Sequence, residues 1–136
     1  MSIGKLALLY LASVVAFFAI DLVWLSTMTS RLYQPRLGHL LSAEPRLGVA
    51  AGFYLLYVAG VVALAVLPGL QQGSLLAALW RGALLGLIAY ATYDLTNLAT
   101  LRDWPLDITV IDLIWGTTLT GAVSAIGYYA GRFLGL

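Results

Sequence analysis

The sequence has no cysteine and few charged residues. Among its 136 residues, Asp, Glu, Lys and Arg make up only 10%, and His39 is the single histidine. Without cysteine, disulfides and thiolate metal sites are excluded, and one histidine gives no zinc triad. A soluble domain carries about 25% charged residues, so this deficit favours lipid as the solvent. The formal net charge of +1, without a basic run, gives no indication of a nucleic-acid partner.

Familiar catalytic motifs are also missing. The sequence contains no G-x-S-x-G, no H-E-x-x-H, no phosphate-binding loop and no Rossmann glycine string. Ser26 and Ser124 have no histidine near them in the sequence that could act as a base. We therefore expect no catalytic residue, no metal site and no cofactor, and the sequence favours a protein that is not an enzyme.

What the sequence has instead is four long apolar runs in a chain that is 62% hydrophobic. Crossing the roughly 30 Å hydrocarbon core of a bilayer takes about 20 helical residues. In lipid the backbone polar groups must be satisfied within the segment, which favours helices. The runs predict an all-α, antiparallel bundle of four transmembrane helices in a single domain, 1–136. The expected helices cover about 6–28, 47–67, 74–101 and 107–129.

The connections between these runs are short, and the longest, 29–46, lies between the first and second helices. Pro35 predicts a short interfacial turn within it, and Pro45 predicts the start of the second helix. Pro68 followed by Gly69 predicts the turn to the third helix. Positive charges are nearly balanced between the two ends, so membrane orientation stays open. The first run is longer than a signal-peptide core, so we expect it to be retained.

An aspartate recurs near the same end of three of the four runs. The strings are IDLVWLSTMT (20–29) with Asp21, YDLTNLATL (93–101) with Asp94, and IDLIWGTTLT (111–120) with Asp112. At about 1.5 Å per residue, each carboxyl group lies roughly 7–10 Å inside the same interface. An aspartate at the centre of a membrane helix costs about 2.5–3.5 kcal/mol. We therefore expect the three carboxyl groups to meet in one partly dry pocket.

Residues three and four positions from each aspartate share its helix face. Among them we expect Asn97 and Tyr90 as hydrogen-bond partners, and Trp24 and Trp115 as walls. The candidate binding residues are Asp21, Asp94, Asp112, Asn97, Tyr90, Trp24 and Trp115. The alternative is a lock of hydrogen bonds between helices that binds nothing.

Small residues at four-residue spacing predict close helix packing. The pairs are Gly48 with Gly52, Gly82 with Gly86, and Gly127 with Gly131. A polar and small stripe on the fourth helix comprises Thr109, Asp112, Gly116, Thr120 and Ser124. In lipid such residues let two helix backbones approach each other. Whether the packing joins helices of one chain or of two stays open.

Four strings also carry a family resemblance. They are DLVWL (21–25), YDLTNLAT (93–100), WP (104–105) and IDLIWG (111–116). Together they resemble the DUF2177 family, and the resemblance covers nearly the whole chain. It implies a four-helix, multi-pass protein of the bacterial inner membrane and implies no activity.

The residues favour binding or transport of protons or of a small polar or cationic group, with the ligand unknown. The lipid bilayer is the expected partner, and a homodimer would suit transport because four helices make a thin bundle. Two alternatives stay open: a membrane enzyme or accessory subunit that acts on lipids through an aspartate, and a structural membrane partner protein.

Overall fold

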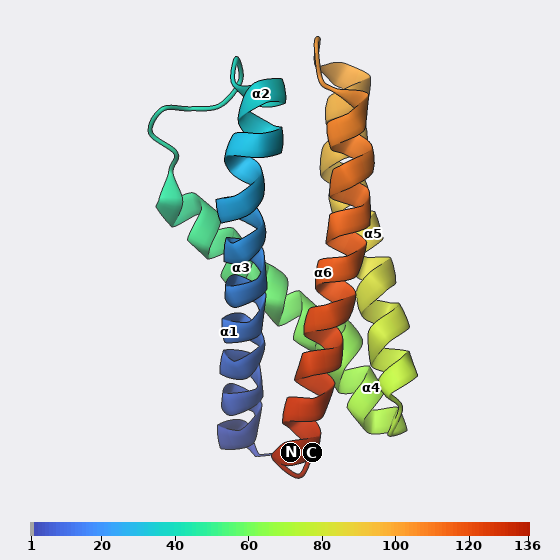
Figure 1. Cartoon of the computed structure of the whole chain (residues 1–136). Coiled ribbons are helices and arrows are strands. Elements are labelled where there is room, and N and C mark those ends of the chain that lie inside the picture. The colour runs from blue at the N-terminus through green and yellow to red at the C-terminus, as the bar shows by residue number, and fades with distance from the viewer. Residues whose placement is uncertain (1) are drawn as a thin grey trace.

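Four long helical segments run through residues 2–136, the part of the chain that the computed structural model describes (Figure 1). They cover Ile3–Leu37, Leu47–Gln72, Leu75–Thr100 and Leu106–Phe133, and each is long and apolar enough to cross a membrane. The prediction of an all-α bundle of four apolar helices is confirmed. Met1, with which the expected domain 1–136 begins, lies outside the described residues.

Two of these segments contain a π-helical turn. The first segment consists of α1 (Ile3–Met28), the π-helical turn η1 (Thr29–Tyr33) and α2 (Gln34–Leu37). The second consists of α3 (Leu47–Val61), the π-helical turn η2 (Val62–Val66) and α4 (Leu67–Gln72). The third and fourth segments are single helices, α5 (Leu75–Thr100) and α6 (Leu106–Phe133).

Two prolines lie inside helices where turns were expected, and this part of the prediction was wrong. The first segment continues past Pro35, and the second continues past Pro68. Each proline comes two residues after a π-helical turn. A proline ring normally clashes with the carbonyl group four residues earlier, and it removes one backbone hydrogen bond. The wider π turn shifts the preceding carbonyl groups, and the helix can therefore continue.

The true turn between the second and third segments lies at Gly73. Its φ of 62° is in the left-handed region, where a residue without a side chain is favoured. The side chain of Ser74 then accepts a hydrogen bond from the N–H of Ala77 and caps α5. The second segment begins at Leu47, at the expected limit, two residues after Pro45.

The tightest packing in the bundle lies between α5 and α6, which run side by side. Gly82 and Gly86 of α5 face α6, and a Cβ atom at Gly86 would overlap the carbonyl oxygen of Gly116. Close approach through small residues is typical of membrane helices, because lipid provides no hydrophobic drive between them. By contrast, a Cβ atom at Gly48 or Gly52 would meet nothing within 4 Å.

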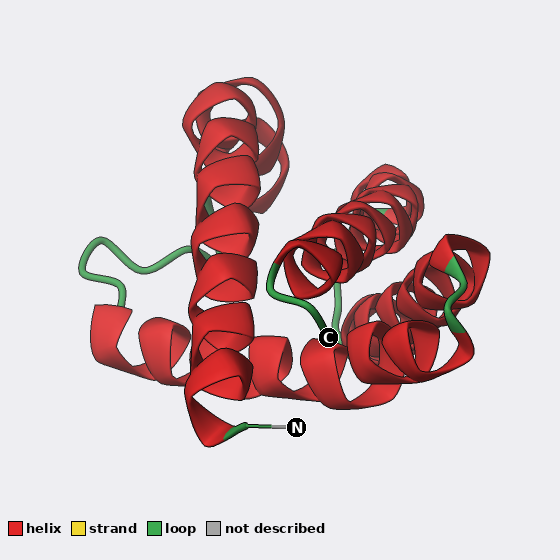
Figure 2. Ribbon diagram, turned by 90° about the horizontal axis from the view of Figure 1, so that it is seen from below, coloured by secondary structure: helices red, strands yellow, loops and turns green. Residues whose placement is uncertain are grey.

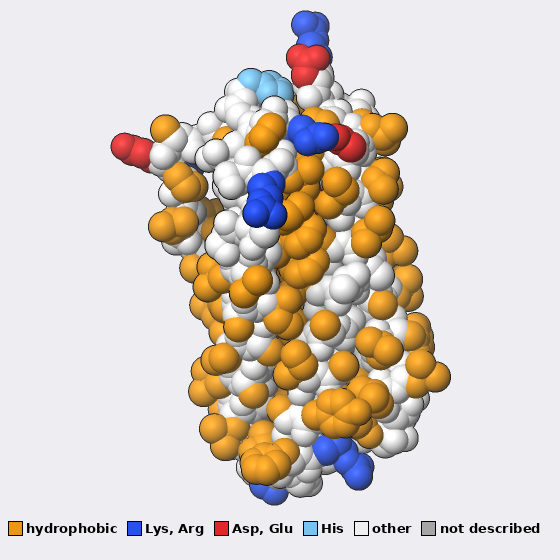
Figure 3. Space-filling model, in the orientation of Figure 1, with side chains coloured by type: hydrophobic (Ala, Val, Ile, Leu, Met, Phe, Trp, Pro, Cys, Tyr) orange, Lys and Arg blue, Asp and Glu red, His pale blue; other side chains and the backbone are white. Residues whose placement is uncertain are grey.

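The α3 helix runs obliquely to the other long helices (Figures 1 and 2). The middle of α3 packs against α1, where the ring of Tyr54 contacts Phe17 and Phe18, while η2 and α4 pack against α5. Both chain termini lie at the opposite end of the bundle from α2 (Figure 1). On the face seen in Figure 3, hydrophobic side chains cover the middle and charged side chains lie at the two ends, as expected for a protein embedded in lipid.

Candidate functional site

A cavity of about 500 Å³ lies in the half of the bundle that carries α2, between α1, α3, α5 and α6. All three aspartates of the repeated strings line it. Their exposed fractions are 5% for Asp21, 0% for Asp94 and 8% for Asp112. The fold therefore brings together three buried carboxyl groups from three different helices.

Aromatic side chains make up most of the rest of the lining. Of the nineteen described residues that line the cavity, ten are aromatic and none is Lys or Arg. The aromatic residues are Phe17, Trp24, Tyr33, Phe53, Tyr54, Tyr57, Tyr90, Tyr93, Trp104 and Trp115. The cavity thus combines carboxyl groups with the negatively polarised faces of aromatic rings.

Asp112 receives its hydrogen bond from a residue of the first segment. The hydroxyl of Tyr33, in η1, donates to Oδ1 of Asp112 over 2.6 Å. The indole Nε1 of Trp24 donates in turn to the Tyr33 hydroxyl over 3.0 Å. This chain of two hydrogen bonds joins α1 and η1 to α6, and it gives Asp112 the donor that a buried carboxylate needs.

Asp21, on α1, receives its hydrogen bond from a residue of α6. The indole Nε1 of Trp115, in α6, donates to Oδ1 of Asp21 over 3.2 Å, and the hydroxyl of Tyr54 lies beside the same carboxyl group. The rings of Trp24 and Trp115 are stacked, with centroids 4.2 Å apart and planes 8° apart. Each tryptophan therefore supports the aspartate of the opposite helix, and the stacked pair forms one wall of the cavity.

Asp94 is the exception among the three. Within residues 2–136, neither of its carboxyl oxygens has a hydrogen-bond partner. Its carboxyl group lies beside that of Asp112, which lines the same cavity. A buried polar group without a partner is costly, and an unpaired buried charge costs more. Asp94 therefore needs a proton or a positively charged partner.

The expected hydrogen bonds to Asp94 from Asn97 and Tyr90 do not form. Asn97 does not line the cavity. A residue three positions along a helix is rotated by about 60° from the first. On α5 this rotation leaves Asn97 outside the lining, whereas Trp24 and Trp115, at the same spacing from Asp21 and Asp112, lie within it. Tyr90 does line the cavity, and its ring lies against Gly116 across the seam between α5 and α6.

Several tyrosines of the lining are not predicted by the sequence. Tyr33 lies within 29–46, which the sequence predicts as a connection and not as a helix. Tyr54 and Tyr57 belong to the second helix, which carries no aspartate. The hydroxyl groups of Tyr57 and Thr120 are hydrogen-bonded over 2.8 Å. A signal was present, because Tyr54 and Tyr57 are spaced three residues apart and so lie near one another on a helix.

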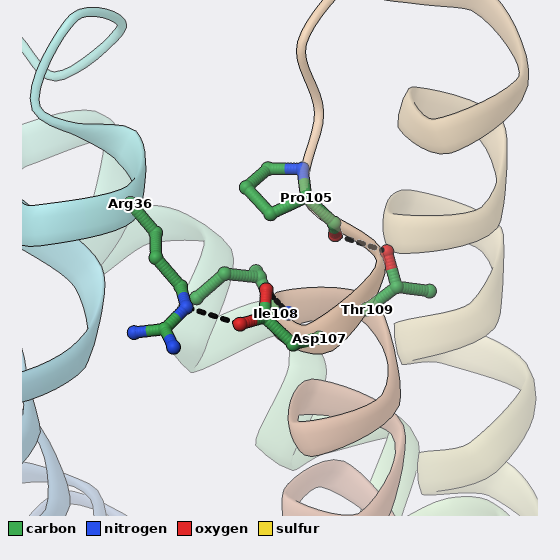
Figure 4. A network of polar contacts seen from close by, with 5 residues as sticks. All are labelled: Arg36, Pro105, Asp107, Ile108 and Thr109. Atoms are coloured by element: carbon green, nitrogen blue, oxygen red, sulfur yellow. Dashed lines mark hydrogen bonds and ion pairs between the residues drawn. The ribbon is translucent and has the colours of Figure 1, made fainter.

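Apolar side chains close the cavity at the α2 end. Leu37 and Trp104 line the cavity and belong to a buried cluster with Leu32 and Ile108. Next to this cluster, Arg36 of α2 forms an ion pair with Asp107 in the first turn of α6 (Figure 4). The Asp107 carboxyl group also accepts a hydrogen bond from the N–H of Ile108 (Figure 4). We call Leu32, Leu37, Trp104 and Ile108 the α2-end cluster.

Within the described residues, no group of three or more His, Cys, Asp or Glu side chains is arranged to hold a metal ion. Asp21 and Asp112 accept hydrogen bonds from Trp115 and Tyr33, respectively. These donors already occupy one oxygen of each carboxyl group.

The fold and the cavity define a multi-pass α-helical membrane protein. The family described as "Predicted membrane protein (DUF2177)" matches residues 6–129, and the chain belongs to this family. The resemblance seen in the sequence strings is thereby confirmed. No curated protein and no solved structure shows significant similarity to the chain.

Proposed function

We propose that this membrane protein binds a small cationic group in the cavity. The observation that carries the proposal is the Asp94 carboxyl group, which is fully buried, has no hydrogen-bond partner within residues 2–136 and lies beside Asp112. A bound cation would supply the missing partner and offset the negative charge of the cluster. Since none of the described lining residues is Lys or Arg, the protein itself offers no such charge inside the cavity.

The aromatic lining supports an organic cation. A cation over the face of an aromatic ring gains about 0.5–1 kcal/mol at an exposed site and about 2 kcal/mol or more when it is desolvated. A protonated amine can also donate hydrogen bonds to the free oxygens of Asp94. An inorganic divalent ion is less suitable, because it requires several oxygen ligands arranged around one point.

The test uses the tryptophans of the cavity as reporters. Three of the four tryptophans, Trp24, Trp104 and Trp115, line the cavity. The fourth, Trp80, lies against Arg81. In a Trp80→Phe background, titration with butylammonium in phosphatidylcholine nanodiscs should change the tryptophan fluorescence saturably.

Two matched variants locate the effect. Asp94→Asn should weaken butylammonium binding at least tenfold while the protein still folds, and Asp107→Asn should leave binding unchanged. Both remove one carboxylate charge, but Asp107 is exposed and pairs with Arg36 outside the cavity. If Asp94→Asn bound butylammonium as well as the parent, the carboxyl cluster would be only a structural lock.

A second candidate ligand is the proton, because Asp94 and Asp112 both line the cavity and lie beside each other, and two adjacent carboxyl groups can share one proton. The infrared absorption of a protonated carboxyl group should then disappear in Asp94→Asn and persist in Asp107→Asn. The same spectrum in all three proteins would contradict proton sharing. On the strength of the family resemblance, we propose the bacterial inner membrane as the location.

A further inference from the structure

The exposed part of the cavity lining identifies the side on which the cavity opens. Phe53 of α3 is 56% exposed and Tyr93 of α5 is 59% exposed, yet both line the cavity. Two further lining residues are exposed: Leu41, in the connection before α3, and Ala50, in the first turn of α3. These residues flank the space between α3 and α5, where the oblique course of α3 separates the two helices (Figure 1). We call this opening the α3–α5 gap.

Both ends of the cavity along the bundle axis are closed by buried apolar side chains. At one end lies the α2-end cluster, whose members Leu37 and Trp104 are part of the lining. At the other end, Phe17 lines the cavity and belongs to the main buried core with Val58 and Val61. The α3–α5 gap therefore opens sideways, in the half of the bundle that carries α2. Because it lies between helices that are apolar enough to span the membrane, it leads to lipid below the interface.

The charges of the lining restrict what could enter from lipid. A zwitterionic phospholipid would bring a phosphate group together with its ammonium group. None of the lining residues in the described chain is Lys or Arg, and the nearby Arg36 is already paired with Asp107. A phosphate group would therefore lie close to three carboxyl groups without a positive partner, which is unfavourable. An amine without phosphate avoids this conflict.

We propose that the ligand is a lipophilic amine without a phosphate group, which holds its ammonium group at Asp94 and its alkyl chain in the α3–α5 gap. This inference rests on the cation binding proposed above and specifies the class of ligand. The ammonium group satisfies the free oxygens of Asp94. The alkyl chain lies along Tyr93 and Phe53 and continues into the bilayer.

The first experiment separates the head of the ligand from its tail. In phosphatidylcholine nanodiscs, the Trp80→Phe protein is titrated with butylammonium, dodecylammonium and dodecanol, and tryptophan fluorescence is recorded. We expect dodecylammonium to bind at least tenfold more tightly than butylammonium when the amine concentration is expressed per lipid. Dodecanol should produce no saturable change. Adding phosphatidylethanolamine to the nanodiscs should not compete with dodecylammonium.

The second experiment blocks the α3–α5 gap. Because the chain has no cysteine, a single introduced cysteine can be labelled selectively. A bulky maleimide attached to a Phe53→Cys variant should weaken dodecylammonium binding at least tenfold. The same label on Val15→Cys should have no effect, because Val15 is exposed on α1 and does not line the cavity. Unlabelled Phe53→Cys serves as the reference and controls for the substitution itself.

The outcomes separate this inference from the proposed function. If butylammonium and dodecylammonium bound equally well, or if the label at Phe53→Cys had no effect, the lipophilic ligand would be refuted while cation binding stood. If phosphatidylethanolamine competed, a phospholipid would be the ligand and the exclusion of phosphate would be wrong. If neither amine bound, or if dodecanol bound as well as dodecylammonium, cation binding itself would be refuted.

Discussion

The row of α5 residues that faces α6 changes character halfway along the helix. Toward the end with the chain termini, Gly82 lies against Ser124, and Gly86 lies against Gly116 and Thr120. Farther along the same row, at the same four-residue spacing, lie Tyr90 and the buried Asp94. One half of the seam between α5 and α6 is thus closely packed through small residues. The other half carries the neighbouring carboxyl groups of Asp94 and Asp112 and borders the cavity.

The difference shows how a thin bundle can contain both a rigid contact and a polar chamber. Small residues let the two backbones touch, and this contact determines how the helices are placed. Beyond it, Asp94 comes to lie next to Asp112. The close packing of one half therefore positions the chemistry of the other half, and three substitutions can separate the two contributions.

The largest effect is expected for Gly86→Ala in the closely packed half of the seam. The added methyl group would overlap the backbone oxygen of Gly116, which cannot move without separating the helices. We expect a loss of about 3 kcal/mol in the free energy of unfolding, at the upper end of the usual cost of overpacking. Denaturant unfolding in a fixed detergent would measure it. Gly52→Ala, where the new methyl group meets nothing within 4 Å, should be neutral or slightly stabilising.

An intermediate effect is expected for Tyr33→Phe at the cavity. The substitution removes the hydroxyl that donates to Asp112 and accepts from Trp24. Hydrogen bonds between membrane helices contribute about 0.6 kcal/mol on average and up to about 1.7 kcal/mol. We expect a loss of about 1 kcal/mol together with a change in tryptophan fluorescence. The exposed Tyr129 of α6 is the matched control, and an equal loss in Tyr129→Phe would show that the bond between η1 and α6 contributes nothing.

The smallest effect is expected for Arg36→Gln, outside the cavity. The ion pair with Asp107 joins two side chains that are 42% and 46% exposed, and exposed pairs contribute about 0–1 kcal/mol. We expect a loss below about 0.5 kcal/mol that vanishes at high salt, where exposed charges are screened. Unfolding measured at low and high ionic strength tests this. A loss larger than that of Tyr33→Phe would mean that the ion pair, and not the cavity, holds the α2 end together.

Much of the site could be predicted from the repeated aspartate strings. In lipid a carboxyl group turns toward other protein groups. Three carboxyl groups near the same end of a small bundle are therefore expected to face its interior and to meet there. Gly82 and Gly86 also indicated a close contact, which α5 and α6 make. The predicted hydrogen bond from Asn97 to Asp94 is not made, because sequence spacing gives the helix face only to within about 60°.

The tyrosines were harder to predict for a different physical reason. A π-helical turn inserts about one extra residue into the helix, so the residues after it are rotated relative to an uninterrupted helix. Tyr33, at the end of η1, reaches Asp112 in this way. Nothing in the local sequence distinguishes such a turn from the end of a helix before Pro35.

By itself, the sequence determined the number of apolar helices long enough to span a membrane, their approximate limits and the position of one aspartate toward the same end of three of them. The reason is that the thickness of the bilayer and the cost of burying charge act on each segment separately. Only the tertiary structure decided how each helix is rotated and that α3 stands away from α5. It also decided that, within residues 2–136, Asp94 is the one of the three aspartates whose carboxyl oxygens have no hydrogen-bond partner. These features depend on which side chains meet across helices, and such contacts exist only after the helices have packed.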